Sequence, residues 1–426
     1  MKVLVSHPTG NANVRAIAKG FAEAGNLHSF YTTIATFPDT TLDKLARLPG
    51  LSELKRRNFD AVLHARTRTY PWFEVGRMIS NKAGIRSLTA HESGVFCVDK
   101  VYHSLDKYVA SQLPGLQKSG LTVVYAYEDG ALETFRQAKK LGITCVYELP
   151  IAFWETSRKL LLEEAVRLPD WSETLAGGIS DSEKKLHRKS MELELADIIV
   201  TPGSFVADSL GSLISDKKLI VSPFGSPENN LSTKKTTRNN RPLRVLFAGS
   251  MGQRKGLADL FEAIKILNTK EIELVVLGSL LRELPFYRKQ LPNFTYEPTR
   301  PHAEVLSLMR SCDVFCLPSI VEGRALVIQE AMSQGLPVII TSNTGGKDLV
   351  IEGETGFEVP IRSPDAIAEK LRWFLDNPNQ LDQMSANAQR HSASYSWAGY
   401  TNKIILEIEK YLKKNCVAND TSQYLG

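Results

Sequence analysis

The sequence predicts an α/β protein of two domains, each with a parallel sheet covered by helices on both faces. Short apolar runs, rich in β-branched and aromatic residues, alternate with amphipathic helical patterns along the whole chain. The runs are almost continuously apolar, which is typical of parallel strands buried on both faces. They form two series separated by the polar segment 226–242, and 426 residues suit two or three domains of about 150 residues each.

The first series contains the expected strands and helices of one domain. Strands are predicted at 3–8, 29–37, 59–65, 122–128, 144–150, 197–202 and 219–225. Amphipathic stretches between them predict helices at 13–24, 131–141 and 182–196. We assign residues 1–222 to this first domain and residues 223–242, which are polar and lack an apolar face, to a linker.

The second series predicts another sheet, followed by helices only. Its strands are expected at 243–249, 272–278, 293–298, 314–319, 337–342 and 356–360. We assign 243–395 to this second domain, expect a helix at 396–414 to pack back toward the first domain, and expect a loose tail at 415–426. In such sheets ligands bind outside the carboxyl ends of the strands, so two facing domains would form a cleft there.

The composition excludes several classes of protein. With 43% hydrophobic and 23% charged residues, the chain is neither disordered, collagen-like nor a disulfide scaffold. It has no apolar run of about 18 residues, and its first residues suit a strand better than a signal peptide. The five cysteines are an odd number, so reduced thiols and a cytoplasmic location are expected. A net charge of +5 is too small for this length to predict a nucleic-acid partner.

The loop after the expected strand 243–249 carries a pair of cations. Arg254 and Lys255 follow Gly249 and Gly252, at the entrance of the next helix. Two cations at a helix N-terminus are unfavourable for the helix dipole, and a bound anion would offset this. The loop therefore predicts a diphosphate site, and the alternative is a solvated pair of charges.

A second candidate binding loop follows the expected strand 314–319. Gly323 allows close approach to the backbone, and a helix is expected from about Arg324 to Gln334. The first N–H groups of that helix, from Arg324, Ala325 and Leu326, would suit a phosphate or a sugar oxygen.

Two carboxylates flank the start of this helix. On one helix, Glu322 and Glu330 would lie about 12 Å apart, too far to share a proton. They suit instead the two ends of an elongated ligand with hydroxyl groups at each end, such as a nucleotide-sugar. The alternative is a solvated loop carboxylate and an ordinary carboxylate on a helix surface.

These segments together resemble a known family. Residues 243–399 are similar to the donor domain of retaining GT-B glycosyltransferases of the family 4 type, the glycosyl transferases group 1. The matching blocks occur in collinear order and are GSMGQRKG, VEGRALVIQE, EAMSQGLPVI, NTGGKDLVIEGETGFEVP and YSW. ADIIVTPGSFVADSL and VSPFG also resemble the end of that family's first domain. The resemblance implies a GT-B fold, in which two Rossmann-like domains face each other across a cleft.

The resemblance also implies roles for individual positions. Glu322 would be a catalytic residue that contacts hydroxyls of the donor sugar, and Glu330 would contact the ribose. Lys255 would hold the diphosphate leaving group. The backbone at Gly323, Arg324, Ala325 and Leu326 would approach the sugar and the diphosphate, and Gly278 would line the donor site.

One position departs from the family pattern. Where the family usually has an arginine after the glycine of its first strand, this chain has Ser250. We expect Arg254 to supply the missing guanidinium to the diphosphate.

The first domain is expected to hold the acceptor. The loop after its first strand contains Gly10 and Asn11, which resemble the loop that faces the donor in this family. His7 lies just before them and is interpreted either as part of the site or as a hydrogen-bonded strand-end residue.

A carboxylate takes the place of an expected histidine. Many relatives have a His near the anomeric carbon, where this chain has Glu148. A carboxylate there would accept a hydrogen bond from the acceptor, so Glu148 is the second candidate catalytic residue. The alternative is a structural role for Glu148 at the strand end. In that case Glu128 and Asp129 would take the catalytic place.

Basic residues gather between positions 40 and 90. Ten basic and four acidic side chains give this segment a formal charge of +6. The basic residues are Lys44, Arg47, Lys55, Arg56, Arg57, Arg66, Arg68, Arg77, Lys82 and Arg86. Leucines recur through part of it at helical spacing, namely Leu42, Leu45, Leu48, Leu51 and Leu54. Such a surface suits an anionic membrane or an anionic acceptor, and the alternative is a solvated face over core leucines.

The sequence therefore predicts a glycosyltransferase that moves a sugar, with retention, from a nucleotide-sugar to a glycan, lipid-linked or other hydroxyl acceptor. No D-x-D pair or His/Cys cluster occurs, so no metal is expected, and no cofactor beyond the nucleotide-sugar as co-substrate. A cytoplasmic enzyme, peripheral at the membrane, in polysaccharide or glycolipid biosynthesis fits these expectations. The alternatives are a GT-B-fold nucleotide-sugar epimerase or hydrolase, and a catalytically silent partner subunit.

Overall fold

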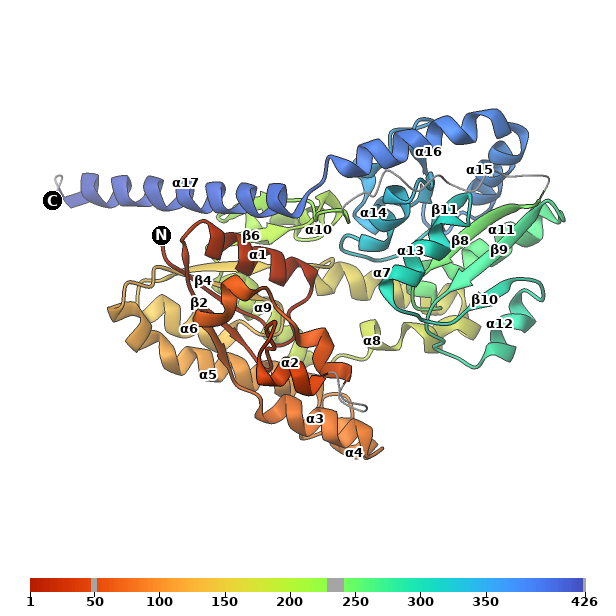
Figure 1. The fold of residues 1–426 in the computed structure, drawn as a ribbon. Coiled ribbons are helices and arrows are strands. Elements are labelled where there is room, and N and C mark those ends of the chain that lie inside the picture. The colour runs from red at the N-terminus through yellow and green to blue at the C-terminus, as the bar shows by residue number, and fades with distance from the viewer. Residues whose placement is uncertain (47–51, 228–240, 424–426) are drawn as a thin grey trace.

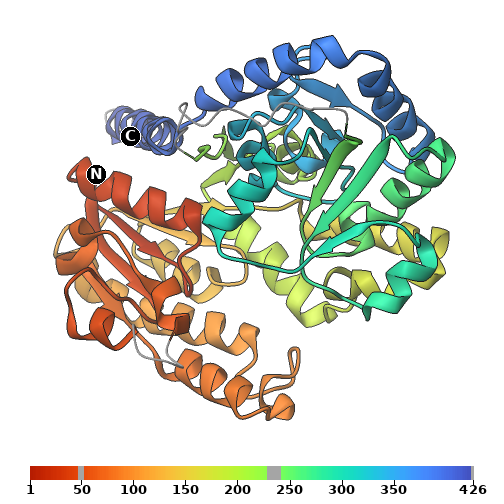
Figure 2. The same cartoon turned by 45° about the vertical axis from the view of Figure 1, so that its right-hand side comes forward.

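A computed structural model describes residues 1–46, 52–227 and 241–423. The described residues form two parallel sheets, one in each half of the chain, and each sheet has helices packed against it. The two halves lie side by side in both views (Figures 1 and 2). The two-domain α/β fold is therefore confirmed.

The first sheet has seven strands in the order β3-β2-β1-β4-β5-β6-β7. They are β1 (Val3–Ser6), β2 (Leu27–Thr32), β3 (Thr67–Thr69), β4 (Val123–Tyr127), β5 (Thr144–Glu148), β6 (Ile198–Thr201) and β7 (Lys218–Val221). The helices of this half are α1 (Ala12–Glu23), α2 (Thr41–Ala46), α3 (Trp72–Lys82), α4 (Arg86–Thr89), α5 (Val98–Lys118), α6 (Leu132–Lys140), α7 (Trp154–Arg167), α8 (Ala176–Ile179), α9 (Glu183–Leu195) and α10 (Ser204–Asp208).

Both faces of the first sheet are buried. Val3 and Val5 on β1 belong to one apolar cluster, and Leu4 between them belongs to another. Neighbouring residues of a strand point to opposite faces, so this division shows a core on each side. The continuous apolar runs in the sequence follow from this double burial.

One expected strand of the first domain is wrong. Residues 59–65 were expected to be extended, but residues Ala61–Arg66 form a 3-10 helix, and the short β3 follows it. Asp60 explains the difference, because its carboxylate accepts a hydrogen bond from the N–H of Val62 at 3.0 Å. This side-chain cap favours a helical turn over an extended strand.

The second sheet has six strands in the order β10-β9-β8-β11-β12-β13. They are β8 (Leu243–Ala248), β9 (Ile272–Leu277), β10 (Thr295–Glu297), β11 (Val314–Leu317), β12 (Val338–Ile340) and β13 (Gly356–Glu358). Its helices are α11 (Leu257–Leu267), α12 (Leu284–Gln290), α13 (His302–Arg310), α14 (Leu326–Ser333), α15 (Pro364–Asp376) and α16 (Pro378–Ala393). The strand order changes direction between β8 and β11, as it does between β1 and β4 in the first sheet, and such points are where ligands bind.

The last helix, α17 (Trp397–Gln423), leaves the second half and lies along the first (Figure 1). Tyr400, Ile404 and Ile408 are buried in the same cluster as α1 and β1 of the first domain. The helix does not end at 414 but continues to Gln423, into the segment 415–426 that was expected to be a loose tail. The physical reason is the composition, because no glycine or proline interrupts the sequence between Gly399 and Gly426.

A segment of the first half packs on the second domain. Trp171 is 3% exposed and belongs to the core of the second sheet, although it lies within the range 1–222. The segment that carries it runs from α7 to α8, and it lies against the second half in both views (Figures 1 and 2). The expected boundary at 222 therefore separates the strands of the two sheets, but it assigns this segment to the first domain although Trp171 packs in the core of the second.

No helix among the described residues is both long enough and apolar enough to cross a membrane. The expected linker 223–242 is described only at 223–227 and 241–242.

Candidate active site

A cavity of about 480 Å³ opens at the carboxyl edge of the second sheet. We call it the second-domain cavity. Its lining residues come from the ends of β8 and β9, from the loops after β8, β9, β10 and β11, from α13 and from the start of α14. They are Ala248, Gly249, Ser250, Lys255, Leu277, Gly278, Ser279, Thr299, Arg300, Val305, Glu322, Arg324, Ala325, Leu326 and Val327. The two candidate binding loops of the sequence, after β8 and after β11, therefore meet in one site.

Glu322 joins the two loops through ion pairs. Its Oε1 lies 2.5 Å from Nζ of Lys255 and 2.6 Å from Nη1 of Arg254. Burial lowers the pKa of Lys255, the positive charge of Arg254 lowers it further, and the carboxylate of Glu322 acts in the opposite direction. The site therefore holds a buried ammonium group whose charge depends on a neighbouring carboxylate.

Arg254 and Lys255 differ in position. Lys255 lines the second-domain cavity, whereas Arg254 is not among its lining residues. The guanidinium of Arg254 also donates to the carbonyl of Val321 at 3.2 Å, so it holds the loop that carries Glu322. This placement favours Lys255 over Arg254 as the contact to a diphosphate.

The start of α14 differs from the sequence-based expectation. The helix begins at Leu326, and the N–H of Ala325 already donates to the carbonyl of Thr344 at 3.2 Å. The first-turn N–H groups that have no partner within the helix are therefore those of Leu326 and Val327, and both residues line the second-domain cavity. The side chain of Arg324 is fully buried and pairs with Asp348 at 2.6 Å, so only its backbone can serve a ligand.

Gly323 is needed for a contact between the two halves of the chain. A Cβ atom at Gly323 would lie 1.6 Å from the carbonyl oxygen of Pro150. In the same way, a Cβ atom at Gly345 would lie 1.5 Å from the carbonyl oxygen of Gly323. Close approach at Gly323 was expected from a ligand, but in the structure the backbone after β5 takes that place.

Glu330 and Gly278 occupy different parts of the site. Gly278 lines the second-domain cavity, and a Cβ there would lie 1.7 Å from the carbonyl oxygen of Gly249. Glu330 lies one turn into α14, outside the lining set, and its Oε1 is 3.0 Å from Nε2 of His302. The structure therefore places Gly278 in the cavity wall and Glu330 beside it, paired with α13.

Two residues that the sequence motifs did not indicate, Thr299 and Arg300, line the second-domain cavity after β10. Arg300 pairs with Glu297 at the end of that strand. The signal was present, because a loop that follows an expected parallel strand lies at the edge where ligands bind. Arg300 thus adds a cation to the wall of the cavity that Lys255 also lines.

A second cavity, of about 310 Å³, opens at the carboxyl edge of the first sheet. We call it the first-domain cavity. Its lining residues are His7, Asn11, Asn13, His91, Val98, Asp99, Tyr102, Tyr127, Glu128, Asp129, Pro150 and Lys185. Pro150 lines this cavity and touches Gly323, whose neighbours line the other, so the two cavities adjoin at this contact.

His7 is a hydrogen-bond acceptor at the base of the first-domain cavity. Its Nδ1 accepts the N–H groups of Thr9 and Gly10, both at 3.0 Å. Burial, with a smaller effect from the charge of Arg57, lowers the pKa of His7 to about 3. The ring is therefore neutral, carries its proton on Nε2, and shapes the loop that presents Asn11 to the cavity.

Comparison with known proteins agrees with this geometry. The family model of glycosyl transferases group 1 matches residues 228–391. D-inositol 3-phosphate glycosyltransferase of Corynebacterium glutamicum (strain R) is 27% identical over 68% of this chain and 77% of its own length. The capsular polysaccharide biosynthesis glycosyltransferase CapM of Staphylococcus aureus is 27% identical over 42% of this chain and 52% of its own length. The match to this family covers residues 228–391, and over most of its length the chain is similar to a glycosyltransferase.

Solved structures show the fold of this glycosyltransferase. Sucrose-phosphate synthase from Thermosynechococcus elongatus has a TM-score of 0.65 at 17% identity and covers 98% of this chain, and all of that structure is matched (100%). Anabaena Alr3699/HepE, solved in complex with UDP, has a TM-score of 0.61 at 14% identity, and the match covers 96% of this chain and 100% of that structure. The fold is GT-B, as the motifs in the second half of the sequence predicted.

Glu148, the second catalytic candidate of this glycosyltransferase, lies in the core of the first domain. It is 1% exposed and is not a lining residue of either cavity. Its carboxylate accepts hydrogen bonds from Asn13 at 2.6 Å, Tyr125 at 2.6 Å and Tyr400 at 2.9 Å. Burial raises the pKa of Glu148. These surroundings favour the structural alternative for Glu148.

The pair Glu128 and Asp129 lines the first-domain cavity instead. Lys189 lies 3.1 Å from Glu128 and 3.6 Å from Asp129, and burial raises the pKa of both carboxyl groups. Asp129 has φ +67°, and its Oδ1 is buried without a hydrogen-bond partner among the described residues. An unpartnered carboxylate oxygen in a cavity wall is suited to a hydroxyl ligand.

The basic segment 40–90 of the glycosyltransferase is only partly a free surface. Arg57 and Arg77 both pair with the buried Glu74. The leucine stripe is not one helix, because α2 ends at Ala46 and a 3-10 helix covers Ser52–Arg57. Leu42 is exposed, and Arg47, Leu48 and Leu51 lie outside the described residues.

Proposed function

We propose that this glycosyltransferase binds a nucleotide-sugar in the second-domain cavity and transfers the sugar, with retention, to a hydroxyl group in the first-domain cavity. The observation that carries the proposal is the meeting of Lys255, Glu322 and the first turn of α14 in one cavity. A cation and free N–H groups suit a diphosphate, and the adjacent carboxylate suits sugar hydroxyls. The contact between Pro150 and Gly323 supports direct transfer, because it brings the two cavities together.

Each part of the donor has a partner in this arrangement. Lys255, with the N–H groups of Leu326 and Val327, would hold the diphosphate, and Arg300 is close enough to the same wall to add a second charge. Glu322 would exchange part of its pairing with Lys255 for hydroxyls of the sugar. Glu330 would contact the ribose after its pairing with His302 is released.

In a single displacement, retention requires attack on the face from which the diphosphate leaves. The acceptor oxygen forms the new bond to the anomeric carbon, and the bond from that carbon to the diphosphate oxygen breaks. The proton of the acceptor hydroxyl passes to the departing phosphate oxygen, so the products are a glycoside and a nucleoside diphosphate. Lys255 and the helix N-terminus would stabilise the charge on the leaving group, a role for which a metal ion is not required.

The acceptor is proposed to be a glycan, a lipid-linked or another hydroxyl compound. Curated relatives are named for D-inositol 3-phosphate and for capsular polysaccharide biosynthesis, and both names imply polyhydroxylated acceptors. The polar wall of the first-domain cavity, with Asn11, Glu128 and Asp129, suits such hydroxyls. The relatives are transferases, which favours transfer over the epimerase and hydrolase alternatives.

We also propose a cytoplasmic location with peripheral contact to an anionic membrane, through α3 rather than the leucine stripe. Trp72, Val75 and Ile79 lie on one face of α3 and are 70%, 38% and 63% exposed. Lys82 and Arg86, at the end of α3 and the start of α4, are exposed beside them. An apolar face bordered by cations suits the surface of an anionic bilayer.

A donor-binding assay tests the central proposal. We expect UDP or GDP, and one of their sugar conjugates, to raise the melting temperature of the protein. Lys255→Ala should remove most of this shift, whereas Lys265→Ala, which changes an exposed lysine of α11, should keep it. The proposal fails if no nucleotide or nucleotide-sugar stabilises the wild-type protein. Flotation with anionic vesicles, comparing wild type with Trp72→Ser/Ile79→Ser, tests the membrane contact.

A further inference from the structure

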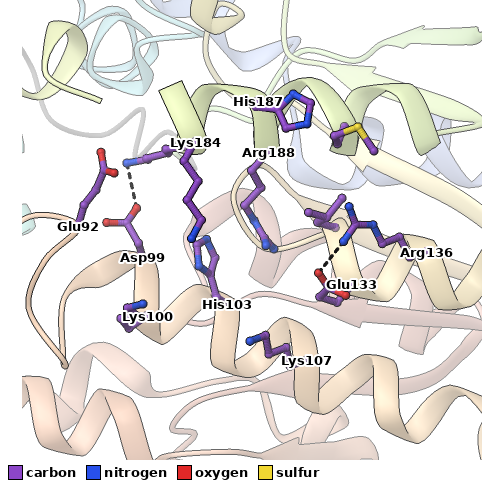
Figure 3. A pocket seen from close by; sticks show the side chains of 13 residues that line it. Glu92, Asp99, Lys100, His103, Lys107, Glu133, Arg136, Lys184, His187 and Arg188 are labelled. Carbon is purple, nitrogen blue, oxygen red and sulfur yellow. Dashed lines mark hydrogen bonds and ion pairs between the residues drawn. The ribbon is translucent and has the colours of Figure 1, made fainter. Parts of the chain in front are cut away.

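A third pocket, of about 400 Å³, lies between α5, α6 and α9 of the first domain (Figure 3). We call it the α5–α9 pocket. Six lysine and arginine side chains line it, against three carboxylates. Such an excess of positive charge in a cavity attracts anions.

Half of these cations are already neutralised. Lys185 pairs with Asp99 at 3.0 Å, and Arg136 pairs with Glu133 at 3.0 Å. Arg188 lies 2.5 Å from a carboxylate oxygen of Asp106, at the base of the pocket. These pairs fix the walls and leave the remaining cations for a ligand.

The other three, Lys100, Lys107 and Lys184, are exposed to solvent and have no ion pair or hydrogen bond with any described residue. Lys100 and Lys107 are seven residues apart on α5, which places them on one face of that helix. Lys184 comes from α9 on the opposite side of the pocket (Figure 3). Three ammonium groups on facing helices repel one another, and a bound anion would reverse this repulsion.

The wall between these lysines contains an unsatisfied nitrogen. Nε2 of His103, three residues after Lys100 on α5, is buried and has no hydrogen-bond partner among the described residues. Burial, with a smaller effect from the charge of Arg188, lowers the pKa of His103 to about 4, so the ring is neutral near pH 7. A neutral imidazole can donate one hydrogen bond to an anion that enters the pocket.

The α5–α9 pocket adjoins the first-domain cavity. Asp99 and Lys185 line both, and their ion pair forms the boundary between them. A molecule with a hydroxyl in the first-domain cavity would have to extend past this ion pair to reach Lys184 and Lys107. The two spaces measure about 310 and 400 Å³, which together suit a ligand larger than a single sugar.

We propose that the α5–α9 pocket binds a phosphate group of the acceptor, while the hydroxyl that receives the sugar lies in the first-domain cavity. The proposal rests on the proposed function, and it adds the chemical class of the acceptor. A phosphate matches three ammonium groups better than a carboxylate does, because it carries up to two negative charges and three acceptor oxygens. Lysine binds phosphate as a point charge, without the fixed fork geometry of arginine.

Binding to the full-length protein tests this proposal. The probes are glucose 6-phosphate, inorganic phosphate, glucose, and phosphatidylcholine vesicles with and without phosphatidic acid. Lys107→Ala/Lys184→Ala removes two charges from the pocket. Lys118→Ala/Lys140→Ala removes the same charge from exposed positions on α5 and α6 outside it, and serves as the matched control. UDP binding is measured for every variant.

The pocket variant is expected to bind a phosphate-bearing probe at least tenfold more weakly than the control variant, with UDP binding unchanged. Glucose 6-phosphate bound more tightly than either inorganic phosphate or glucose would identify a soluble phosphorylated acceptor. Binding confined to phosphatidic acid vesicles would identify a lipid-borne phosphate. Equal affinity of the two double variants for every probe would overturn the proposal. It would also be overturned if the protein bound inorganic phosphate as tightly as glucose 6-phosphate and did not bind the vesicles. If the wild-type protein does not bind UDP, the proposed function is contradicted instead.

Discussion

The phenol oxygen of Tyr400 lies 2.9 Å from a carboxylate oxygen of Glu148, across 252 positions of sequence. This hydrogen bond connects α17, the last helix, to the end of β5 in the first sheet. Both side chains are buried, so water cannot replace the bond. The position that was expected to serve catalysis thus anchors the end of the chain to the first domain.

We expect Tyr400→Phe to lower the free energy of unfolding by about 1–3 kcal/mol, because it removes a donor from a buried carboxyl group. Binding of the nucleotide-sugar in the second-domain cavity should not change. Chemical denaturation with a nucleotide-binding assay checks both expectations. Tyr411→Phe is the matched control, since it changes a partly buried tyrosine of the same helix. Equal destabilisation by both changes would show that the hydrogen bond to Glu148 has no special role.

The segment between α7 and α8 should stabilise the second domain. Trp171→Ala removes a side chain packed against Phe261, Phe286 and Tyr287, and truncating such a core residue costs about 3–5 kcal/mol. Hydrogen exchange should become faster in β8 and β9 and remain unchanged in β1 and β4. Phe135→Ala, in the core of the first sheet, should show the reverse pattern. Faster exchange confined to the first sheet after Trp171→Ala would contradict this packing.

The sequence predicted the two sheets well because their central strands are buried on both faces and therefore have a continuous apolar signature. The strand expected at 59–65 failed because one side-chain cap at Asp60 outweighed a short apolar run. The docking of Trp171 on the second domain could not be predicted, since an apolar residue in a helical segment does not show which core it enters.

The candidate site was predicted best where a motif fixed the backbone. The loops with Lys255 and Glu322 meet as expected, because both follow central strands of one sheet. Glu148 was misplaced because a residue at a strand end can point into the core or the cleft, and the sequence does not show which. The reason for Gly323 was also hidden, since its neighbour Pro150 lies in the other half of the chain.

Gly323→Ala should separate the two halves of the site. The added Cβ would lie 1.6 Å from the carbonyl oxygen of Pro150, a backbone atom that cannot move aside alone. We expect sugar transfer to fall at least tenfold, together with lower stability, because both loops must shift. Gly115→Ala adds the same methyl group where no atom lies within 4 Å, and it should leave activity unchanged. Wild-type activity in Gly323→Ala would show that this contact does not position the site.

The charge of Lys255 should make donor binding sensitive to pH. Burial already lowers the pKa of Lys255 from 10.5, and Glu322 opposes this effect, so Glu322→Gln should lower that pKa further. Diphosphate binding requires the protonated ammonium group, so affinity for UDP should fall as pH rises through the pKa of Lys255. In Glu322→Gln this fall should begin at lower pH than in the wild type. Titrations with UDP between pH 7 and 10 measure the difference. Glu330→Gln, which removes a carboxylate paired with His302 rather than with Lys255, should weaken UDP binding at every pH and keep the pH at which the fall begins. Identical profiles for wild type and Glu322→Gln would show that Glu322 does not control the charge of Lys255.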